Sequence, residues 1–255
     1  MGSSLLQIIL PALAILPPPS RSLRLVFAVR ALKSIALRIL LPAALLIGVA
    51  GSSLATSGGL PLPEPGTYKL DRIQEAPFSI VREGTSLPSL LSNYTKGKIT
   101  LLAFFYVQCR EPQGCPLAWS AFETVRERIK ADHKLNGKVR FVFFSFDRVN
   151  DVPQTLQFFV DARRADVDMA PWHFITAWTD YLLEQTLRKF GQDISVRTDS
   201  AGEKSIVIDH MLKVFLIDPD GWVREIYTTG YLDPDAIVGD METLLLEEKQ
   251  SNLAN

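Results

Sequence analysis

The chain has 255 residues, with 27 Lys+Arg against 28 Asp+Glu, so its formal net charge is −1. Hydrophobic residues make up 47% and charged residues 22% of the chain, a composition typical of a globular domain with a sizeable core. A mean hydropathy of +0.12 is too low for a polytopic membrane protein. The near-zero net charge argues against a general nucleic-acid binder, so we expect no nucleic-acid partner.

Charge is unevenly distributed along the chain. Residues 1–60 contain five basic and no acidic side chains, which leaves residues 61–255 with a net charge of −6. A basic stretch that ends at Arg38 precedes the apolar run Ile39–Ala50, and the small residues GSSLA follow at 51–55. This order of basic, apolar and small residues is typical of an export signal.

Two outcomes remain open for this leader. The apolar run is shorter than the roughly 20 residues of a membrane span, which favours a cleaved signal peptide. No charge appears until Glu64, however, so a retained signal-anchor is equally compatible. We therefore expect residues 1–55 to be a signal peptide or membrane anchor that directs the protein to the periplasm or to the periplasmic side of the inner membrane. An acid-free leader with Arg and Ser is also typical of a mitochondrial presequence, which leaves the mitochondrial inner membrane as an alternative.

A linker separates the leader from the folded domain. Residues 56–67 are rich in Pro and Gly, and the run LPLPEPG at 60–66 predicts an extended, semi-rigid segment. We expect the domain to span residues 68–248 and residues 249–255 to form a tail.

The domain alternates between strand-like and helix-like patterns. Continuous β-branched and aromatic runs predict buried strands, and apolar residues at helical spacing predict amphipathic helices. Pro153 suits the first turn of a helix, Gly191 suits a helix end, and the turn sequence DPDG at 218–221 predicts a hairpin. In chain order we expect a strand at Ile99–Val107, a helix at Pro116–Lys130, a strand at Val139–Phe146, a helix at Gln154–Ala162, a strand at Trp172–Thr176, a helix at Tyr181–Phe190, strands at Met211–Ile217 and Val223–Tyr227, and a helix at Asp235–Glu248.

This order begins with parallel crossovers and ends with a hairpin and a helix. It predicts an α/β domain of thioredoxin-like arrangement, preceded by an N-terminal extension at Tyr68–Ser92.

Cys109 and Cys115 are the only cysteines of the chain, and both lie between the first predicted strand and the helix that follows. Sites cluster at such strand ends in α/β folds. Because Pro116 suits the first position of a helix, Cys115 should lie at the N-terminus, where the helix dipole lowers a thiol pKa. The intervening REPQG contains turn-forming residues, so the pair could form a disulfide, either redox-active or purely structural.

Two thiolates are soft donors that favour Cu(I) or Zn(II), and a stable site needs at least one further ligand. Three histidines could supply it. His133 lies in a charged turn and is expected on the solvated surface. His173 follows Trp172 at a strand start and is expected to be a packed core residue. His210 precedes a strand and follows Asp209, whose carboxylate could orient the imidazole ring.

Four sequence features together resemble the Sco/SenC family. These are the pair Cys109 and Cys115-Pro116 after a buried strand, SFDRVNDVPQTL at 145–156, IDH at 208–210 and VFLIDPDG at 214–221, and the match extends from about Phe78 to Leu246. The resemblance implies a membrane-anchored, thioredoxin-like copper-insertion protein of cytochrome oxidase assembly. It also implies that Cys109, Cys115 and His210 bind copper, as Cu(I) and in some states Cu(II). The segment Asp147–Asp151 is similar to the family's acidic turn beside the site.

One departure concerns the spacing of the cysteines. Family members usually have three residues between them, and this chain has five. The implied function is a copper chaperone for an oxidase copper-centre subunit or another cuproprotein, with a redox-active cysteine pair and a thioredoxin-like reductant as a further partner. The alternative is a thiol:disulfide oxidoreductase that reduces client cysteines without carrying metal. The chain has SIVIDHML where ordinary redox thioredoxins place a proline facing the cysteines, which favours metal binding.

Overall fold

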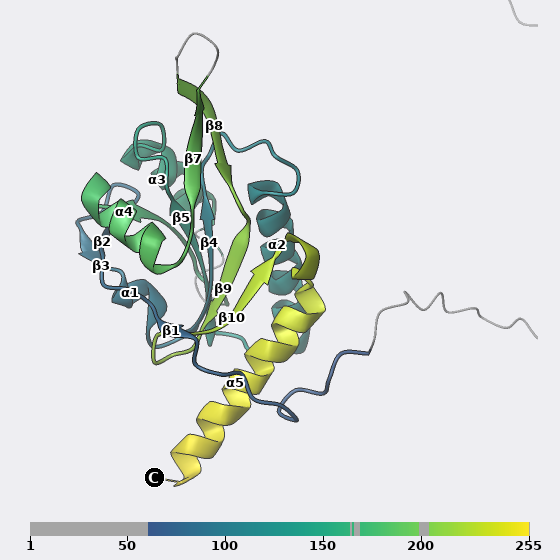
Figure 1. Ribbon diagram of the computed structural model, residues 1–255. Coiled ribbons are helices and arrows are strands. Elements are labelled where there is room, and N and C mark those ends of the chain that lie inside the picture. The colour runs from purple at the N-terminus through teal and green to yellow at the C-terminus, as the bar shows by residue number, and fades with distance from the viewer. Residues whose placement is uncertain (1–60, 164, 166–168, 199–203, 255) are drawn as a thin grey trace, which may run out of the picture. The chain divides into compact units, whose positions relative to one another are not determined.

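The computed structural model describes residues 61–163, 165, 169–198 and 204–254 (Figure 1). The predicted leader at 1–55 lies outside these residues, as does the first part of the predicted linker. Among the helices that the structure describes, none is both long and apolar enough to cross a membrane.

The described chain forms a mixed α/β domain. Its strands are β1 (Gln74–Glu75), β2 (Ile80–Glu83), β3 (Ser89–Leu90), β4 (Ile99–Phe105), β5 (Val139–Ser145), β6 (Trp172–Ala177), β7 (Ile194–Thr198), β8 (Lys204–His210), β9 (Lys213–Ile217) and β10 (Trp222–Thr228). Its helices are α1 (Ser92–Thr95), α2 (Cys115–Asp132), α3 (Pro153–Ala162), α4 (Asp180–Lys189), the 3-10 turn η3 (Thr229–Tyr231) and α5 (Pro234–Ala254).

Eight strands form one sheet in the order β1-β10-β9-β4-β5-β6-β2-β3. Strands β4, β5 and β6 are parallel, and β9 lies antiparallel to β4. The C-terminal ends of the three parallel strands therefore lie on one side of the sheet, which we call the ligand end, and β9 begins there. The DPDG turn between β9 and β10 lies on the opposite side, which we call the hairpin end.

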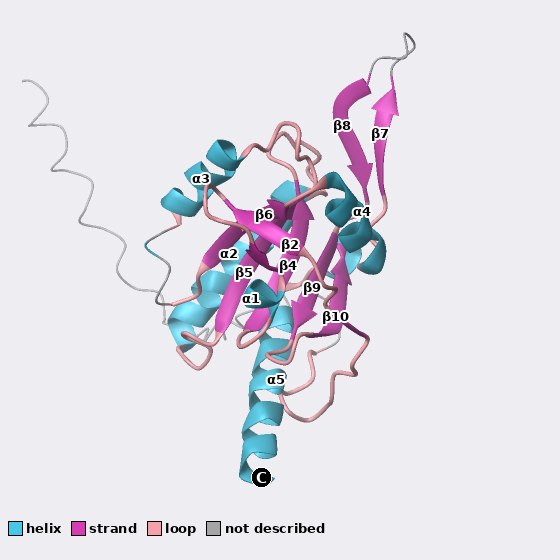
Figure 2. Ribbon diagram, turned by 90° about the vertical axis from the view of Figure 1, so that its left-hand side faces the viewer, coloured by secondary structure: helices cyan, strands magenta, loops and turns pink. Residues whose placement is uncertain are grey.

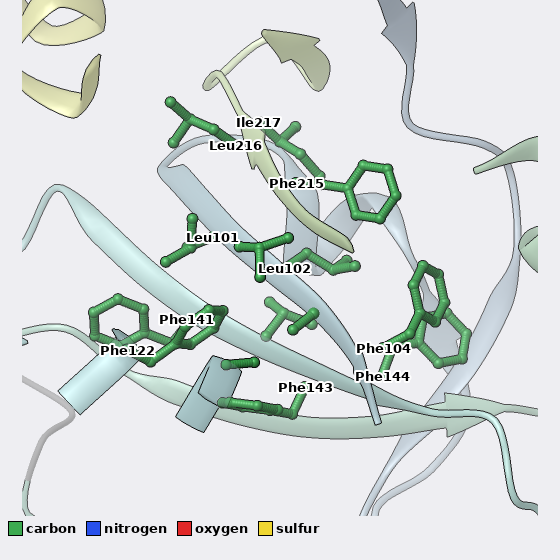
Figure 3. Close-up of a cluster of buried hydrophobic side chains, with 14 of the residues drawn as sticks. Leu101, Leu102, Phe104, Phe122, Phe141, Phe143, Phe144, Phe215, Leu216 and Ile217 are labelled. Carbon is green, nitrogen blue, oxygen red and sulfur yellow. The ribbon is translucent and has the colours of Figure 1, made fainter. Parts of the chain in front are cut away.

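Strands β4 and β5 lie at the centre of the sheet and show no alternation of apolar and polar residues. Every residue of both strands is buried, because helices cover the sheet on its two faces. On one face Phe143 contacts Phe122 and Trp119 of α2, with ring centroids 4.7 and 5.2 Å apart. On the other face the ring of Phe104 lies 5.3 Å from that of Phe190, which follows α4. Figure 3 shows this buried cluster.

The predicted α/β order is confirmed, and three regions differ from the prediction. The extension before β4 contains β1, β2, β3 and α1, whose strands complete both edges of the sheet. Helix α5 continues to Ala254, so most of the predicted tail is helical. Strands β7 and β8 were not predicted; they pair only with each other and project beyond the main sheet (Figure 2).

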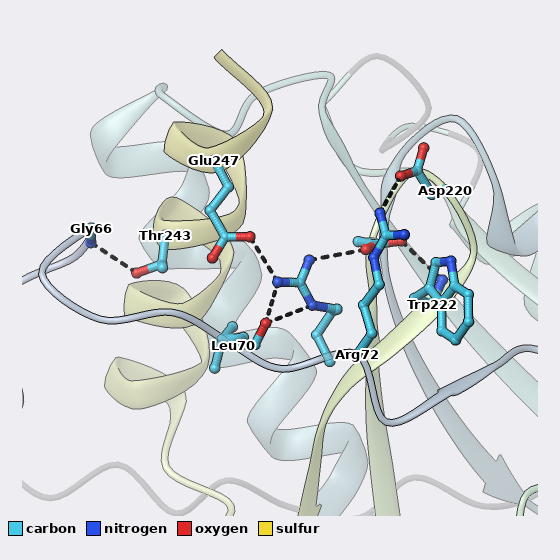
Figure 4. A network of polar contacts seen from close by, with 9 residues as sticks. Gly66, Leu70, Arg72, Asp220, Trp222, Thr243 and Glu247 are labelled. Carbon is cyan, nitrogen blue, oxygen red and sulfur yellow. Dashed lines mark hydrogen bonds and ion pairs between the residues drawn. The ribbon is translucent and has the colours of Figure 1, made fainter. Parts of the chain in front are cut away.

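A buried arginine organises the hairpin end. Arg224 of β10 donates from Nη1 to Asp218 Oδ2 at 3.0 Å, from Nη2 to Glu247 Oε2 at 2.7 Å and from Nε to the Leu70 carbonyl at 2.9 Å. The nearby Gly66 amide donates to Thr243 Oγ1 of α5 at 3.0 Å (Figure 4). These bonds tie the segment before β1 to β10 and α5.

Candidate metal centre

Cys109, Cys115 and His210 meet at the ligand end of the sheet. Cys109 lies in the loop after β4, Cys115 is the first residue of α2, and His210 is the last residue of β8. The two sulfur atoms and a ring nitrogen of His210 all lie within 4.8 Å of one another. Cys115 Sγ is 3.8 Å from His210 Nε2. Three separate elements thus direct soft donor atoms toward one point.

The five-residue loop folds back through two turns. The Cys109 amide donates to the Tyr106 carbonyl at 3.1 Å, and the Gly114 amide donates to the Glu111 carbonyl at 2.9 Å. A β-carbon added at Gly114 would lie 3.3 Å from the Glu111 oxygen and 3.5 Å from Cys109 Sγ, so a glycine here lets the loop close tightly over the sulfur. The longer spacing therefore still allows both thiols to converge.

The two thiols differ in protonation. The hydrogen bond with Cys115 lowers the pKa of Cys109 to about 5, against the opposing effect of burial. The same hydrogen bond, together with burial, raises the pKa of Cys115 above that of an ordinary thiol. The shared hydrogen bond thus favours the thiolate on the half-buried Cys109 and the thiol on the buried Cys115.

This result corrects the expectation that the helix N-terminus lowers the pKa of Cys115. The hydrogen bond with Cys109 and the burial of Cys115, which is only 8% exposed, raise its pKa more than the helix N-terminus lowers it. The lowered pKa belongs to the cysteine in the loop.

The ring of His210 is fixed by three contacts. Its Nδ1 lies 3.2 Å from the Ile208 carbonyl oxygen, and a proton donated there leaves the lone pair on Nε2, the nitrogen that faces Cys115. The rings of Phe146 and Tyr106 meet it edge-on, with centroids 4.9 and 6.0 Å away.

The Ile208 carbonyl is the partner of Nδ1, whereas the sequence suggested Asp209. A backbone carbonyl on the same strand therefore fixes this ring nitrogen.

The other two histidines lie elsewhere. His133 is exposed and ends α2 in a left-handed conformation with φ 63°. His173 Nδ1 lies 2.8 Å from Glu83 Oε1, and its ring meets that of Tyr94 at 5.1 Å. The structure thus brings together the three residues that the family resemblance implied and leaves these two in structural roles.

Two further features lie near the site, and the sequence indicated only one of them. Tyr106 is 4% exposed, and its hydroxyl oxygen accepts a hydrogen bond from the Ile208 amide at 3.4 Å, which links the end of β4 to β8. Beneath the cysteine loop, Asp147 and Asp151 form a buried acidic turn around Ser145. The family resemblance indicated the acidic turn at Asp147–Asp151, whereas a lone Tyr at a strand end gives no signal.

Comparisons with known proteins agree with this arrangement. The sequence profile described as SCO1/SenC matches residues 73–246. No curated protein matches the chain by sequence.

Solved structures identify the fold. Arabidopsis thaliana ScoI with copper bound is 15% identical, with a TM-score of 0.55, and the match covers 68% of this chain and 99% of that one. Yeast Sco1 with copper bound is 16% identical, with a TM-score of 0.53 and coverage of 69% and 89%. Bradyrhizobium japonicum ScoI with copper bound is 18% identical, with a TM-score of 0.51 and coverage of 66% and 98%. The domain therefore has the thioredoxin-like fold of Sco proteins, and the family match over residues 73–246 shows that this chain belongs to the SCO1/SenC family.

Proposed function

We propose that this protein is a copper chaperone that holds Cu(I) through Cys109 Sγ, Cys115 Sγ and His210 Nε2. The observation that carries the proposal is the convergence of these three donor atoms within 4.8 Å from a loop, a helix start and a strand end. Two thiolates and one imidazole suit a three-coordinate soft cation. Three related structures with copper bound support copper as the cargo.

The protonation of the site matches this cargo. The lowered pKa of Cys109 favours a thiolate, and a proton donated from Nδ1 to the Ile208 carbonyl places the ring's lone pair on Nε2. Both cysteines bind as thiolates, so loading should release protons, chiefly from Cys115, whose pKa is raised. A disulfide between the cysteines would remove two ligands at once, which makes loading conditional on their reduction. Cu(II), which prefers nitrogen and more ligands, would depend more strongly on His210.

Membership of the SCO1/SenC family supports the kind of client. We propose that copper passes to the copper-centre subunit of a respiratory oxidase or to another cuproprotein, and that a thioredoxin-like reductant restores the dithiol.

A second function is favoured by one specific observation. Cys109 combines a lowered pKa with partial exposure, and the buried Cys115 lies beside it, which is the arrangement of an attacking and a resolving thiol. A thiol:disulfide oxidoreductase would use this pair without metal. The proximity of His210 Nε2 to Cys115 Sγ at 3.8 Å favours the copper chaperone, because thiol exchange requires no imidazole.

Replacing His210 with Ala separates the two functions. We expect the variant to lose Cu(II) binding and to weaken Cu(I) binding in competition with a chromogenic Cu(I) chelator, while its dithiol still titrates normally in a glutathione buffer. His173→Ala serves as the matched control, because it removes a partly buried imidazole remote from the cysteines. Unchanged copper affinity and client support in His210→Ala would reject the copper site and leave the oxidoreductase.

We further propose that residues 1–55 direct the domain out of the cytoplasm, on the basis of the basic, apolar and small-residue order of that segment. A reporter that works only in the cytoplasm, fused after Asn255, should be inactive. An active fusion would contradict the proposal.

A further inference from the structure

A buried carboxylate lies directly beneath the cysteine loop. Asp151 is 1% exposed and lies between β5 and α3 at the ligand end of the sheet. Its Oδ2 accepts a hydrogen bond from Ser145 Oγ at 2.6 Å. Its own amide donates to the Asp147 carbonyl at 2.8 Å, which fixes the backbone of the acidic turn. The last residue of β5 and the acidic turn therefore fix the position of the Asp151 carboxylate.

The remaining partner of Asp151 is the start of the loop that carries Cys109. The Val107 amide lies 3.2 Å from Oδ1 and 3.1 Å from Oδ2 of Asp151. Strand β4 ends at Phe105, whose carbonyl accepts the Phe146 amide at 3.1 Å as the β4–β5 ladder ends. Two residues later, the Val107 amide faces β5 in the same way. In a regular ladder a backbone carbonyl of β5 would accept it; here the Asp151 carboxylate does. The bond therefore extends the sheet to within two residues of Cys109.

The charge of Asp151 has no cationic partner in the described part of the chain. Arg148, the nearest arginine in sequence, instead binds Asp180 and donates to the Ala177 and Trp178 carbonyls at 2.9 and 3.0 Å. Burying a carboxylate without a cation is costly, and burial raises the pKa of Asp151 to about 6. A neutral side chain could fill the same space at a lower desolvation cost. The carboxylate is therefore better explained by its hydrogen bonds to the Val107 amide than by a contribution to stability.

We propose that Asp151 is a positioning residue for the metal centre: by accepting the Val107 amide, it anchors the loop so that Cys109 Sγ stays within reach of Cys115 and His210. The anchor raises the effective concentration of Cys109 toward Cys115 and preorganises the three donors for copper. The copper consequence rests on the proposed function. The consequence for disulfide formation does not, because it needs only the two cysteines.

The test compares variants in the full-length protein. Asp151→Ala removes both acceptor oxygens, whereas Asp151→Asn keeps an amide oxygen for Val107 and an amide group that can donate to Ser145. Asp218→Ala is the matched control, because Asp218 is also buried and also accepts a backbone amide, from Trp222 at 2.9 Å, but at the hairpin end. Each protein is equilibrated with glutathione buffers, and alkylation with intact mass measurement gives the equilibrium constant of the Cys109–Cys115 disulfide. Cu(I) affinity is measured by chelator competition.

We expect Asp151→Ala to lower the disulfide equilibrium constant about tenfold, the equivalent of one net hydrogen bond to a charged acceptor, and to weaken copper binding about 10- to 100-fold. Asp151→Asn should stay within about threefold of the parent in both measurements. Asp218→Ala should reduce stability and leave both unchanged.

Three results would overturn the proposal: a parent-like disulfide constant in Asp151→Ala, an equal loss in Asp151→Asn, or an equal loss in Asp218→Ala. If Asp151→Ala does not fold, Ser145→Ala removes the bond that orients the carboxylate and should shift the disulfide constant about threefold in the same direction; no shift would then count against the proposal. A parent that binds no copper would reject the proposed function, while the disulfide measurement would still decide the role of Asp151.

Discussion

At the hairpin end of the sheet, the buried Asp218 carboxylate faces the Arg224 guanidinium at 3.0 Å, and Glu247 completes the network. At the ligand end, Asp151 is buried as deeply, and among the described residues it has hydrogen-bond donors but no cation as partner. Both carboxylates accept backbone amides near a strand end. They differ in whether an opposite charge compensates their desolvation.

The difference separates two uses of buried polar groups. The network around Arg224 joins segments that are distant in sequence, and each charge in it has a partner, so its consequence is cohesion of the domain. The Asp151 network joins two loops next to the cysteines at a cost in stability. We therefore expect changes in the Arg224 network to alter folding without altering the metal centre, whereas loss of the Asp151 anchor should alter the metal centre itself.

The largest expected effect is that of Arg224→Ala. Removing one member of a buried ion-pair network leaves Asp218 and Glu247 uncompensated, so the free energy of unfolding should fall by about 3–5 kcal/mol in urea denaturation. The disulfide equilibrium constant of the folded variant should match that of the parent.

Arg72→Ala is the matched control for Arg224. Arg72 pairs with Asp220 at 2.8 Å in the same hairpin region, but the two side chains are 52% and 70% exposed, so its loss should cost at most about 1 kcal/mol. Equal losses in the two arginine variants would contradict the assignment of cohesion to the buried network.

A second prediction concerns the pH dependence of stability at the ligand end. The pKa of Asp151 is about 6 in the folded protein, raised by burial and by the neighbouring Asp147, against about 3.9 in an unfolded chain. Between these values the folded state binds more protons than the unfolded state, so stability falls as pH rises through this window. The cost reaches about 3 kcal/mol above pH 6.

Asp151→Asn lacks this titration and isolates it. The free energy of unfolding of the parent, minus that of the variant, should decrease by about 3 kcal/mol between pH 4 and pH 7 in urea denaturation. A difference that is constant with pH would mean that Asp151 carries no such cost. An increase with pH would mean that a cation compensates the carboxylate after all.

The two ends of the sheet also differ in how far the sequence predicts them. The strand expected at Ile99–Val107 is observed as β4, Ile99–Phe105, because a continuous apolar run reports burial on both faces. The convergence of Cys109 and Cys115 follows from a short loop with turn-forming residues. His210 could be assigned only through the family resemblance, since its place beside the cysteines depends on the path of β8, which the sequence did not reveal.

Three features were missed, each for its own physical reason. Strands β7 and β8 pair only with each other, and the thioredoxin-like order that the sequence predicts contains no such hairpin between α4 and β9. The bond between Val107 and Asp151 joins residues 44 apart in the chain, and nothing local to either residue indicates it. The prediction ended α5 at Glu248 because the residues that follow lack apolar periodicity. The helix continues to Ala254, since Glu, Lys and Gln in its last turns are good helix formers.

The smallest expected effect is that of Tyr106→Phe, which tests how far hydrogen bonds control the ligand end. The substitution keeps the ring that contacts His210 and Phe146 and removes the hydroxyl, which accepts the Ile208 amide at 3.4 Å and also interacts with the Cys109 thiol. A bond of this length is weak, so the loss in unfolding free energy should be about 0.5–1 kcal/mol, and copper affinity should change by less than about threefold. Tyr227→Phe provides the comparison, since it removes a buried hydroxyl that donates to the Asp240 carboxylate at 2.6 Å and should cost about 1.5–3 kcal/mol in the same urea titration. A change in copper affinity above tenfold in Tyr106→Phe would mean that the Tyr106 hydroxyl, through Ile208 or Cys109, shares control of the centre with Asp151.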